Sequence, residues 1–339
     1  YMALYHRRII DKKYILFSCR FQELVAQFSR EETVLIGGPA ELRLAMKLRL
    51  PFRFSGDLYA ACPDVFTSEP GSRFPSAALR VIERWQAFFA RQANGSYLVT
   101  PTDTLPIGLM LSKIAARCDR TRVVCVQHGL FNSGYDSDDI DGRSSHINLV
   151  YSAAQGREML RRLPHALVET MGFPSETRLV TCEGRAPRVI VLVGTGALEV
   201  LDVYKRSLAI YRDLARMMTG CGYNVFYRPH PTERPEHYSG KELVVDTRPK
   251  GSLLGGEGKV FFGFTSTLLY EANLSGHLVV TLDDPLLPGY SIETIGLQLA
   301  TRELHQSPRI VTEGWCERQR QKAVSGPMLR ERFTGALDR

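Results

Sequence analysis

The 339-residue sequence has no apolar run that approaches the roughly 20 residues needed to cross a bilayer. Its first stretch, YMALYHRRIIDKK, lacks the uninterrupted apolar core of a signal peptide. It has no block of lysine and arginine interleaved with aromatic residues, no recognisable nucleic-acid-binding module and no internal repeat. We therefore expect a cytoplasmic protein that does not bind nucleic acid.

Paired cysteines are also absent. The seven cysteines form no CxxC pair and are scattered among apolar neighbours, so we expect reduced thiols and no structural zinc, whose ligands usually come in closely spaced pairs. The acidic run YDSDDIDGRSSH brings Asp136, Asp138 and Asp139 together but lacks the glutamate and the spacing of an EF-hand loop. We interpret it as a solvated loop without metal, with closure over a substrate as an alternative role.

The chain carries a formal net charge of +7, with 44% hydrophobic and 23% charged residues. This composition is typical of globular proteins, and the length favours two domains. The positive charge favours an anionic partner, which is a nucleic acid, a membrane surface or a phosphorylated substrate. The charge alone does not choose among the three.

Short apolar β-type runs alternate with segments of helical period, which predicts parallel sheets built from βαβ units. The polar segment before residue 185 is broken by glycine and proline, and it marks a boundary between two Rossmann-like halves. Strands are expected at 14–17, 33–38, 97–100, 122–127, 147–151, 189–196, 223–228, 242–246, 259–264 and 277–283. Helices are expected at 37–48, 103–117, 207–220 and 266–276.

The stretch KVFFGFTSTLLYEANLSGHLVV (259–280) runs from a strand through a hydroxyl-rich turn into a helix. Free N–H groups at a helix N-terminus bind phosphate, assisted by the helix dipole. The turn residues Thr265, Ser266 and Thr267 would add hydroxyl donors. The alternative is that Ser266 or Thr265 only caps the helix.

The stretch YNVFYRPHPTERPEH (223–237) runs from an apolar strand into a loop stiffened by proline. Arg228, His230 and Pro231 lie at the start of that loop. Because the carboxyl ends of parallel strands reach one edge of a sheet, we expect the arginine, the imidazole and the hydroxyl turn to converge there. A cation, an imidazole and a helix N-terminus at one edge predict a monophosphate or diphosphate site.

Two further turns carry candidate residues. One turn follows a strand and contains Gly194, Thr195 and Gly196; a contact to the nucleotide donor and a plain glycine turn are equally favoured interpretations of it. NAD binding is not expected, because the full GxGxxG fingerprint is missing. The strand RVVCV delivers Gln127 and His128 to the sheet edge.

His128 suits the role of general base, since its ordinary pKa is near 6.5. Asp103 is a rival base or an orienting partner, although helix N-cap is the role we favour for it.

RPHPTE followed by GFTSTLLYEA resembles the His-Pro and Ser/Thr motifs of bacterial sialyltransferases and polysialyltransferases, which are metal-independent GT-B enzymes that use CMP-sialic acid. Related pairs occur in Kdo transferases and in CDP-glycerol glycerophosphotransferases. The resemblance implies that His230 and Ser266 or Thr267 hold the CMP phosphate, with Glu271 as a ribose or base contact. Those sialyltransferases take their base from an acidic pair before a glycine; here His128 precedes Gly129, as in the glycerophosphotransferases.

The resemblance implies an α/β protein of the GT-B fold, whose two Rossmann-like domains have parallel sheets facing a cleft between them. Residues 1–184 would bind the acceptor and residues 185–339 the nucleotide donor, with the last helix able to pack back on the first domain. The expected activity is inverting transfer of a sialic-acid-like or Kdo-like sugar from CMP to a bacterial surface glycan such as capsule or lipopolysaccharide. No cofactor is expected beyond the nucleotide-sugar co-substrate. The alternatives are a CDP-polyol phosphotransferase, a UDP-sugar epimerase and a non-catalytic GT-B binding module.

Two stretches are both basic and apolar: ELRLAMKLRLPFRF (41–54), with Arg43, Lys47, Arg49 and Arg53, and ERQRQKAVSGPMLRER (317–332). Such stretches bind anionic lipid in some proteins, which is the basis for a peripheral role at the inner membrane, on which a lipid-linked glycan acceptor would lie. The solvated face of an ordinary helix is the interpretation that we favour.

Overall fold

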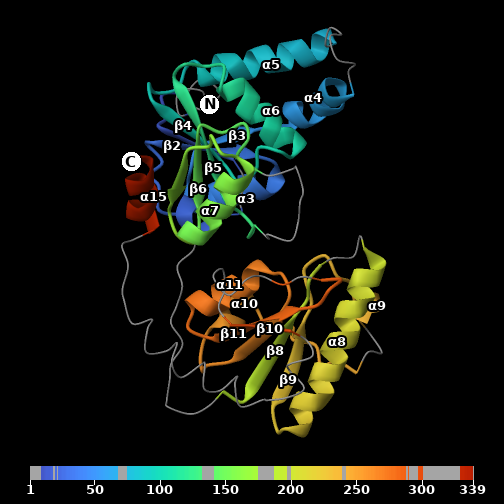
Figure 1. Ribbon diagram of the computed structural model, residues 1–339. Coiled ribbons are helices and arrows are strands. Elements are labelled where there is room, and N and C mark those ends of the chain that lie inside the picture. The colour runs from blue at the N-terminus through green and yellow to red at the C-terminus, as the bar shows by residue number, and fades with distance from the viewer. Residues whose placement is uncertain are drawn as a thin grey trace. The chain divides into compact units, whose positions relative to one another are not determined.

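The structure, a computed structural model, divides into two compact units. Each unit is built on its own parallel sheet (Figure 1). The residues that the structure describes are 9–17, 20, 22–67, 75–131, 141–174, 187–196, 200–238, 242–287, 289, 297–300 and 329–338. The first unit holds those between 9 and 128, between 141 and 174 and from 329 to 338, and the second holds 129–131 and those between 187 and 300.

The first unit contains a seven-stranded sheet in the order β3-β2-β1-β4-β5-β6-β7, in which every neighbouring pair is parallel. Its strands are β1 (Tyr14–Phe17), β2 (Thr33–Gly37), β3 (Phe52–Phe54), β4 (Ser96–Thr100), β5 (Thr121–Val126), β6 (Ile147–Val150) and β7 (Val168–Thr170). Its helices are α2 (Gln22–Val25), α3 (Pro39–Leu48), α4 (Gly56–Phe66), α5 (Ser76–Phe89), α6 (Pro106–Ala115), α7 (Ala153–Arg162) and α15 (Leu329–Leu337).

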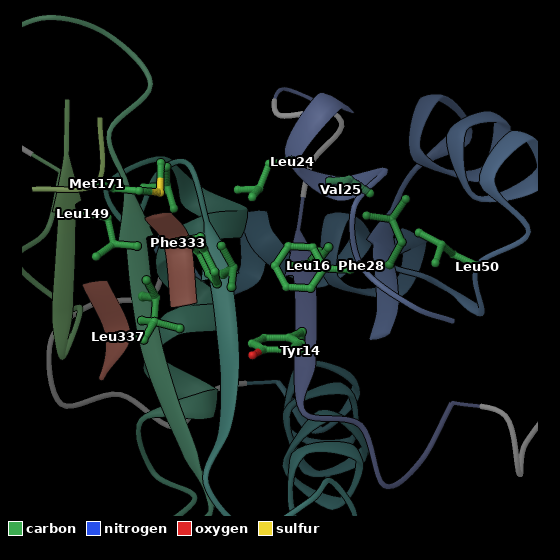
Figure 2. Close-up of a cluster of buried hydrophobic side chains, with 14 of the residues drawn as sticks. Tyr14, Leu16, Leu24, Val25, Phe28, Leu50, Leu149, Met171, Phe333 and Leu337 are labelled. Carbon is green, nitrogen blue, oxygen red and sulfur yellow. The ribbon is translucent and has the colours of Figure 1, made fainter. Parts of the chain in front are cut away.

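Both faces of this sheet are buried, which is why its strands are continuous apolar runs in the sequence. Successive side chains of a strand point to opposite faces, so Tyr14 and Leu16 lie in one core cluster, while Ile15 and Phe17 lie in the other. The cluster around Tyr14 includes Phe333 of α15, whose ring centroid is 5.4 Å from that of Phe28 (Figure 2). The C-terminal helix therefore completes the core of the first unit.

The second unit contains a five-stranded parallel sheet in the order β12-β11-β10-β8-β9. The long helix α8 covers it with buried residues at helical spacing, from Tyr204 through Leu208 and Tyr211 to Met218. The strands are β8 (Val189–Val193), β9 (Asn224–Arg228), β10 (Val260–Gly263), β11 (Leu278–Asp283) and β12 (Leu297–Ala300). The helices are α8 (Leu201–Gly220), α9 (Pro235–Tyr238), α10 (Lys250–Leu254) and α11 (Thr267–Leu274).

The fold class predicted from the sequence is confirmed, and so are nine of the ten expected strands, within a few residues at their ends. The expected strand at 242–246 is wrong: this segment makes only an isolated bridge between Tyr227 and Val245. The short strands β3, β7 and β12 were not expected. Among the described residues, no helix has both the length and the apolar character needed to cross a membrane.

Candidate functional site

The strand orders identify one position in each sheet where a ligand site is expected. In an open parallel sheet, ligands bind beyond the carboxyl ends of the strands at the point where the strand order reverses. In the first unit that point lies between β1 and β4, and in the second it lies between β8 and β10. The candidate residues named from the sequence follow β4, β5, β8, β9 and β10, at or next to these two points.

In the second unit, the glycine turn and the histidine loop pack directly against each other. The backbone N–H of Gly194 donates to the carbonyl of Arg228 (2.9 Å). A Cβ atom added to Gly194 would lie 2.8 Å from the backbone nitrogen of His230, and one added to Gly196 would collide with the His230 ring. Gly196 also has a positive φ of 68°. These two glycines therefore allow the close approach of His230, and Thr195 lies between them.

The hydrogen bonds of His230 fix its tautomer. Its Nδ1 accepts from the backbone N–H of Thr232 (3.3 Å) and lies 2.8 Å from the Thr232 hydroxyl. In the neutral ring the proton is therefore on Nε2, which becomes a hydrogen-bond donor. Burial lowers the pKa of His230, against the opposing charge of Glu233. The ring is thus neutral at pH 7 and presents one N–H donor.

Glu233 is a buried residue of this site that the sequence analysis did not single out. Its carboxylate accepts from the hydroxyls of Tyr227 (2.6 Å) and Tyr204 (3.3 Å) and from the backbone N–H of Gly196 (3.4 Å). Burial, and then the adjacent Glu233 charge, raise the pKa of Tyr204. Glu233 therefore ties the histidine loop to the glycine turn and to α8. The sequence signal that could have identified Glu233 is its position three residues after His230 in RPHPTE.

The remaining candidates of the second unit are placed as follows. Ser266 is the N-cap of α11, because its side chain accepts from the backbone N–H of Leu268 (3.3 Å). Phosphate binding by this turn remains a prediction. Thr265 and Thr267 flank this cap and are half-buried, and Pro231 is exposed.

Two other candidate side chains bond within the unit. Arg228 donates to the carbonyls of Asp246 (3.1 Å) and Arg248 (2.6 Å), and Glu271 forms an ion pair with Lys250 (2.5 Å). Phosphate binding by Arg228 and nucleoside binding by Glu271 remain predictions.

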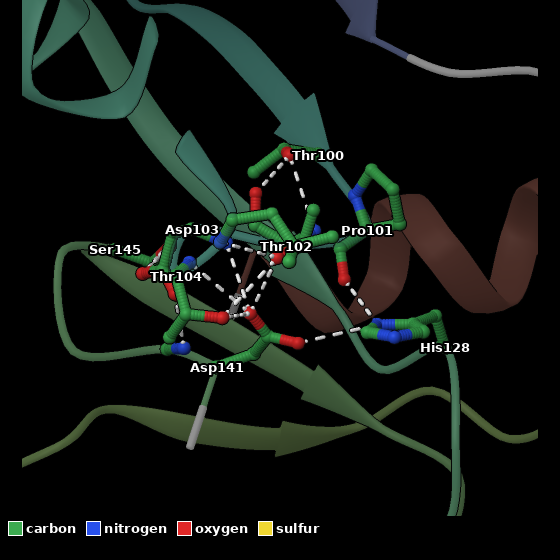
Figure 3. A network of polar contacts seen from close by, with 10 residues as sticks. Thr100, Pro101, Thr102, Asp103, Thr104, His128, Asp141 and Ser145 are labelled. Carbon is green, nitrogen blue, oxygen red and sulfur yellow. Dashed lines mark hydrogen bonds and ion pairs between the residues drawn. The ribbon is translucent and has the colours of Figure 1, made fainter. Parts of the chain in front are cut away.

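In the first unit, His128 forms a dyad with an aspartate distant in sequence (Figure 3). Its Nδ1 lies 2.5 Å from the carbonyl oxygen of Pro101 and 3.3 Å from Oδ2 of Asp141. Because a carbonyl only accepts, Nδ1 carries the proton, and the neutral ring keeps its lone pair on Nε2. Burial lowers the pKa of His128; Asp141 opposes this shift, and the charge of Arg20 adds to it. Nε2 is therefore the atom suited to accept a proton.

Asp103 and Asp141 brace the two loops that hold this dyad. Asp103 is 1% exposed, and its carboxylate accepts from the backbone N–H groups of Gly142 (2.6 Å) and Ser144 (2.7 Å). In return, Oδ1 of Asp141 accepts from the hydroxyls of Thr102 and Thr104, both at 2.7 Å. Asp141 was not found from the sequence, since only the fold brings it to these threonines.

Asp103 and Gln127 were both assigned roles from the sequence. The N-cap role of Asp103 is wrong, because α6 begins at Pro106 with Leu105 as its N-cap, and the Asp103 carboxylate is directed to the loop at 142–145 instead. Gln127 is 4% exposed, donates to Gln155 Oε1 (2.6 Å) and accepts from the backbone of Tyr151 (2.9 Å). Its amide therefore joins β5 to the segment after β6, and its catalytic role is still only a prediction.

A cavity of about 620 Å³ opens beside the dyad, at the carboxyl ends of β1 and β4. Pro101 and Thr102 line it, and the same two residues hold His128 and Asp141 through hydrogen bonds. Ligand pockets have volumes of about 300–1,000 Å³. The cavity therefore has the size of a ligand site, and two residues of its wall bond to the dyad.

The acidic run at Asp136, Asp138 and Asp139 and most of the basic stretch at 317–332 lie outside the described residues. Within the described part of the chain, no cluster of three or more His, Cys, Asp and Glu side chains is arranged to hold a metal ion.

The other basic stretch divides into two parts. Arg43, Lys47 and Arg49 are exposed, whereas the Arg53 guanidinium stacks over the rings of Trp85 (4.1 Å) and Phe88 (4.4 Å). Arg53 is therefore not part of a basic surface.

No protein-family model and no curated protein matches this sequence. Solved structures do match it, at low identity. The chain is similar to MnaA of S. aureus with UDP (TM-score 0.59, 10% identity, 97% of this chain and 96% of that one). It is also similar to a putative UDP-N-acetylglucosamine 2-epimerase of Listeria monocytogenes (TM-score 0.58, 8% identity, 96% of this chain and 95% of that one). A third similar structure is a UDP-forming α,α-trehalose-phosphate synthase of Burkholderia vietnamiensis (TM-score 0.51, 9% identity, 97% of this chain and 98% of that one).

These similarities show the fold alone: two Rossmann-like units of the GT-B type. The chain spans 59% of the length of a matched chain of the GtfA/B complex, with a TM-score of 0.43.

Proposed function

We propose that this chain is a glycosyltransferase that takes a sugar from a nucleotide donor, with the nucleotide phosphate at the second unit. The observation that carries the proposal is the packing of His230 against the Gly194–Gly196 turn at the β8/β10 switch point, where α11 also begins. A neutral imidazole with an Nε2–H donor and the N-terminus of a helix are both suited to phosphate oxygens.

The proposed chemistry is inverting transfer, with His128 as the general base. Nε2 of His128 takes the proton of an acceptor hydroxyl, while that oxygen attacks the anomeric carbon of the donor sugar. The bond from this carbon to the phosphate oxygen breaks, and the nucleotide leaves with the electron pair. The Pro101 carbonyl holds the ring in the required tautomer, and Asp141 stabilises the imidazolium that forms.

For the donor we propose a CMP-linked sialic-acid-like or Kdo-like sugar, and for the acceptor a bacterial surface glycan. The support is the resemblance of RPHPTE and GFTSTLLYEA to the motifs of CMP-dependent transferases. A UDP-sugar transferase or epimerase is the second candidate, since UDP stands in the names of the three similar structures. A cytoplasmic location with contact to the inner membrane also remains a prediction.

Calorimetric titration with CMP, CDP, UDP and GDP tests the proposal and ranks the donors. Replacing His230 by alanine removes one hydrogen bond to a charged group, so affinity for the preferred nucleotide should fall about ten- to a hundredfold. The control is His165→Ala, at an exposed histidine of the first unit, which should bind as wild type. Preference for CMP or CDP supports the cytidine donor, and preference for UDP supports the second candidate. Binding of no nucleotide, or equal binding by His230→Ala, would overturn the phosphate site.

A further inference from the structure

The wall of the cavity in the first unit combines polar and apolar residues. One wall consists of Pro101, Thr102 and Arg20, next to the His128–Asp141 dyad. Pro101 belongs to this wall and also accepts the Nδ1–H hydrogen bond of His128 (2.5 Å). A hydroxyl bound against Pro101 would therefore lie near the proposed base.

The apolar part of the wall comes from α4, from Leu105 and from the start of α6, and Leu105 adjoins the polar part because its N–H donates to the Thr102 hydroxyl (3.2 Å). It includes Tyr59, Phe66 and Leu105, which are 53%, 46% and 55% exposed, with Pro63 and Ile107 between them. Single exposed apolar side chains are common on proteins, but a group of them around one cavity marks a binding surface. Among the described residues of the wall, Arg20 and Glu41 are the only ones with charged side chains.

From this juxtaposition we infer that the cavity binds the acceptor, and that the acceptor is an amphipathic molecule with its nucleophilic hydroxyl at His128 and a compact hydrocarbon or aryl group between α4 and α6. The inference rests on the proposed transfer function for the role of the hydroxyl. The volume of about 620 Å³ limits the apolar group to the size of a small ligand. A lipid chain of several tens of carbons would extend beyond this volume.

Binding of a ladder of alkyl glucosides tests this inference directly. Methyl, butyl, hexyl, octyl and decyl β-glucosides are titrated below their micelle concentrations, without nucleotide. Each methylene transferred into an apolar site should raise affinity by up to about fourfold. We expect affinity to increase along the ladder and then level off once the cavity is full. A flat ladder would overturn the inference, because it would show that the protein binds no apolar group beside the sugar.

A pair of variants locates the binding. Leu105→Asp places a carboxylate in the apolar wall, at the N-cap position of α6, where aspartate is favourable for the helix, so the fold is preserved. The matched control is Leu167→Asp, at a leucine of the same unit that is 51% exposed and outside the cavity. Hexyl glucoside should bind Leu105→Asp at least tenfold more weakly and the control as wild type. Equal affinity in the two variants would contradict the location.

The thiol of Cys62 provides a second readout, because this cysteine lies in the cavity wall and is not fully buried. Hexyl glucoside should slow its alkylation, measured by peptide mass spectrometry, while leaving the rate at the exposed Cys221 unchanged. Protection of both thiols or of neither would contradict the inference. These readouts involve no nucleotide, so their failure is distinct from a failure of the nucleotide titrations.

Discussion

Two histidines carry the proposed chemistry, and their hydrogen bonds give them opposite tautomers. The carbonyl of Pro101 places the proton of His128 on Nδ1, so Nε2 is the acceptor. The backbone N–H of Thr232 uses the Nδ1 lone pair of His230, so Nε2 is the donor. Burial lowers the pKa of both rings, and both are therefore neutral at pH 7. One ring is suited to accept a proton and the other to bind a phosphate oxygen.

The Asp141→Asn variant tests the dyad. Asp141 raises the pKa of His128 against the effect of burial, so removing its charge should lower this pKa further below 6.5. The protonated form of the base becomes rarer, and the acid limb of the kcat/KM profile should move to lower pH. The maximum rate should fall by about 10²-fold, since the imidazolium loses the charge that stabilises it.

NMR titration of the His128 ring measures the same shift without any substrate. Asp119→Asn, at an exposed aspartate of the same unit, is the control and should leave the titration unchanged. An upward shift of the His128 pKa in Asp141→Asn would contradict the dyad.

At the scale of single elements, the turns after β8 and β9 act as one structure. The glycine turn is shaped by the histidine loop, because side chains at Gly194 and Gly196 would occupy the space of His230, Glu233 and Tyr227. Glu233 then bonds both segments. The position of His230 therefore depends on the turn after β8 as much as on its own prolines.

Gly196→Ala tests this dependence, and the chain offers a matched control. Gly196 and Gly222 both have positive φ, at 68° and 86°, so alanine costs about 1–2 kcal/mol of backbone strain at either position. Only at Gly196 would the new methyl group also meet His230; at Gly222 it would meet nothing within 4 Å. Gly196→Ala should therefore lose nucleotide affinity at least tenfold in calorimetry, whereas Gly222→Ala should lose only thermal stability. Equal affinity in the two variants would show that the turn does not position His230.

The elements of this fold were largely predictable from the sequence because buried parallel strands are apolar throughout. The strand at Tyr14–Phe17 and the one at Val260–Gly263 are buried on both faces, and each is visible as an apolar run. The segment 242–246 also has an apolar run, Leu243 to Val245, but Val244 is 62% exposed and the segment forms only the bridge at Val245, since β-propensity depends on pairing and burial.

The candidate site was predictable only in part. His128 and His230 were found because each follows a strand directly. Asp141 lies 13 residues from His128 in the chain and reaches it only through the loop that Asp103 holds, a contact that no local pattern records. Asp103 itself resembles an N-cap in sequence, and only the start of α6 at Pro106 excludes that role.

At the scale of the whole molecule, each unit has its own core, and the C-terminal helix α15 belongs to the first one. Phe333 of α15 is fully buried against Tyr14 and Phe28, and Leu337 and Ala336 lie in the same cluster. The second unit has a separate core, built from α8 and its own sheet. The first unit therefore depends on residues that follow the second unit in the sequence.

Phe333→Ala should destabilise the first unit while leaving nucleotide binding unchanged. Truncation of a fully buried phenylalanine costs about 3–5 kcal/mol, which for a unit of this size lowers the melting temperature on the order of 10 °C. Differential scanning calorimetry with and without the preferred nucleotide assigns each unfolding transition to a unit. The nucleotide raises the melting temperature of only the unit that binds it. Phe54→Ala, at a 58% exposed phenylalanine of the first unit, is the control and should melt as wild type. In the contrary outcome, Phe333→Ala lowers the melting temperatures of both transitions by the same amount. The two units would then unfold together, and α15 would stabilise the whole chain and not the first unit alone.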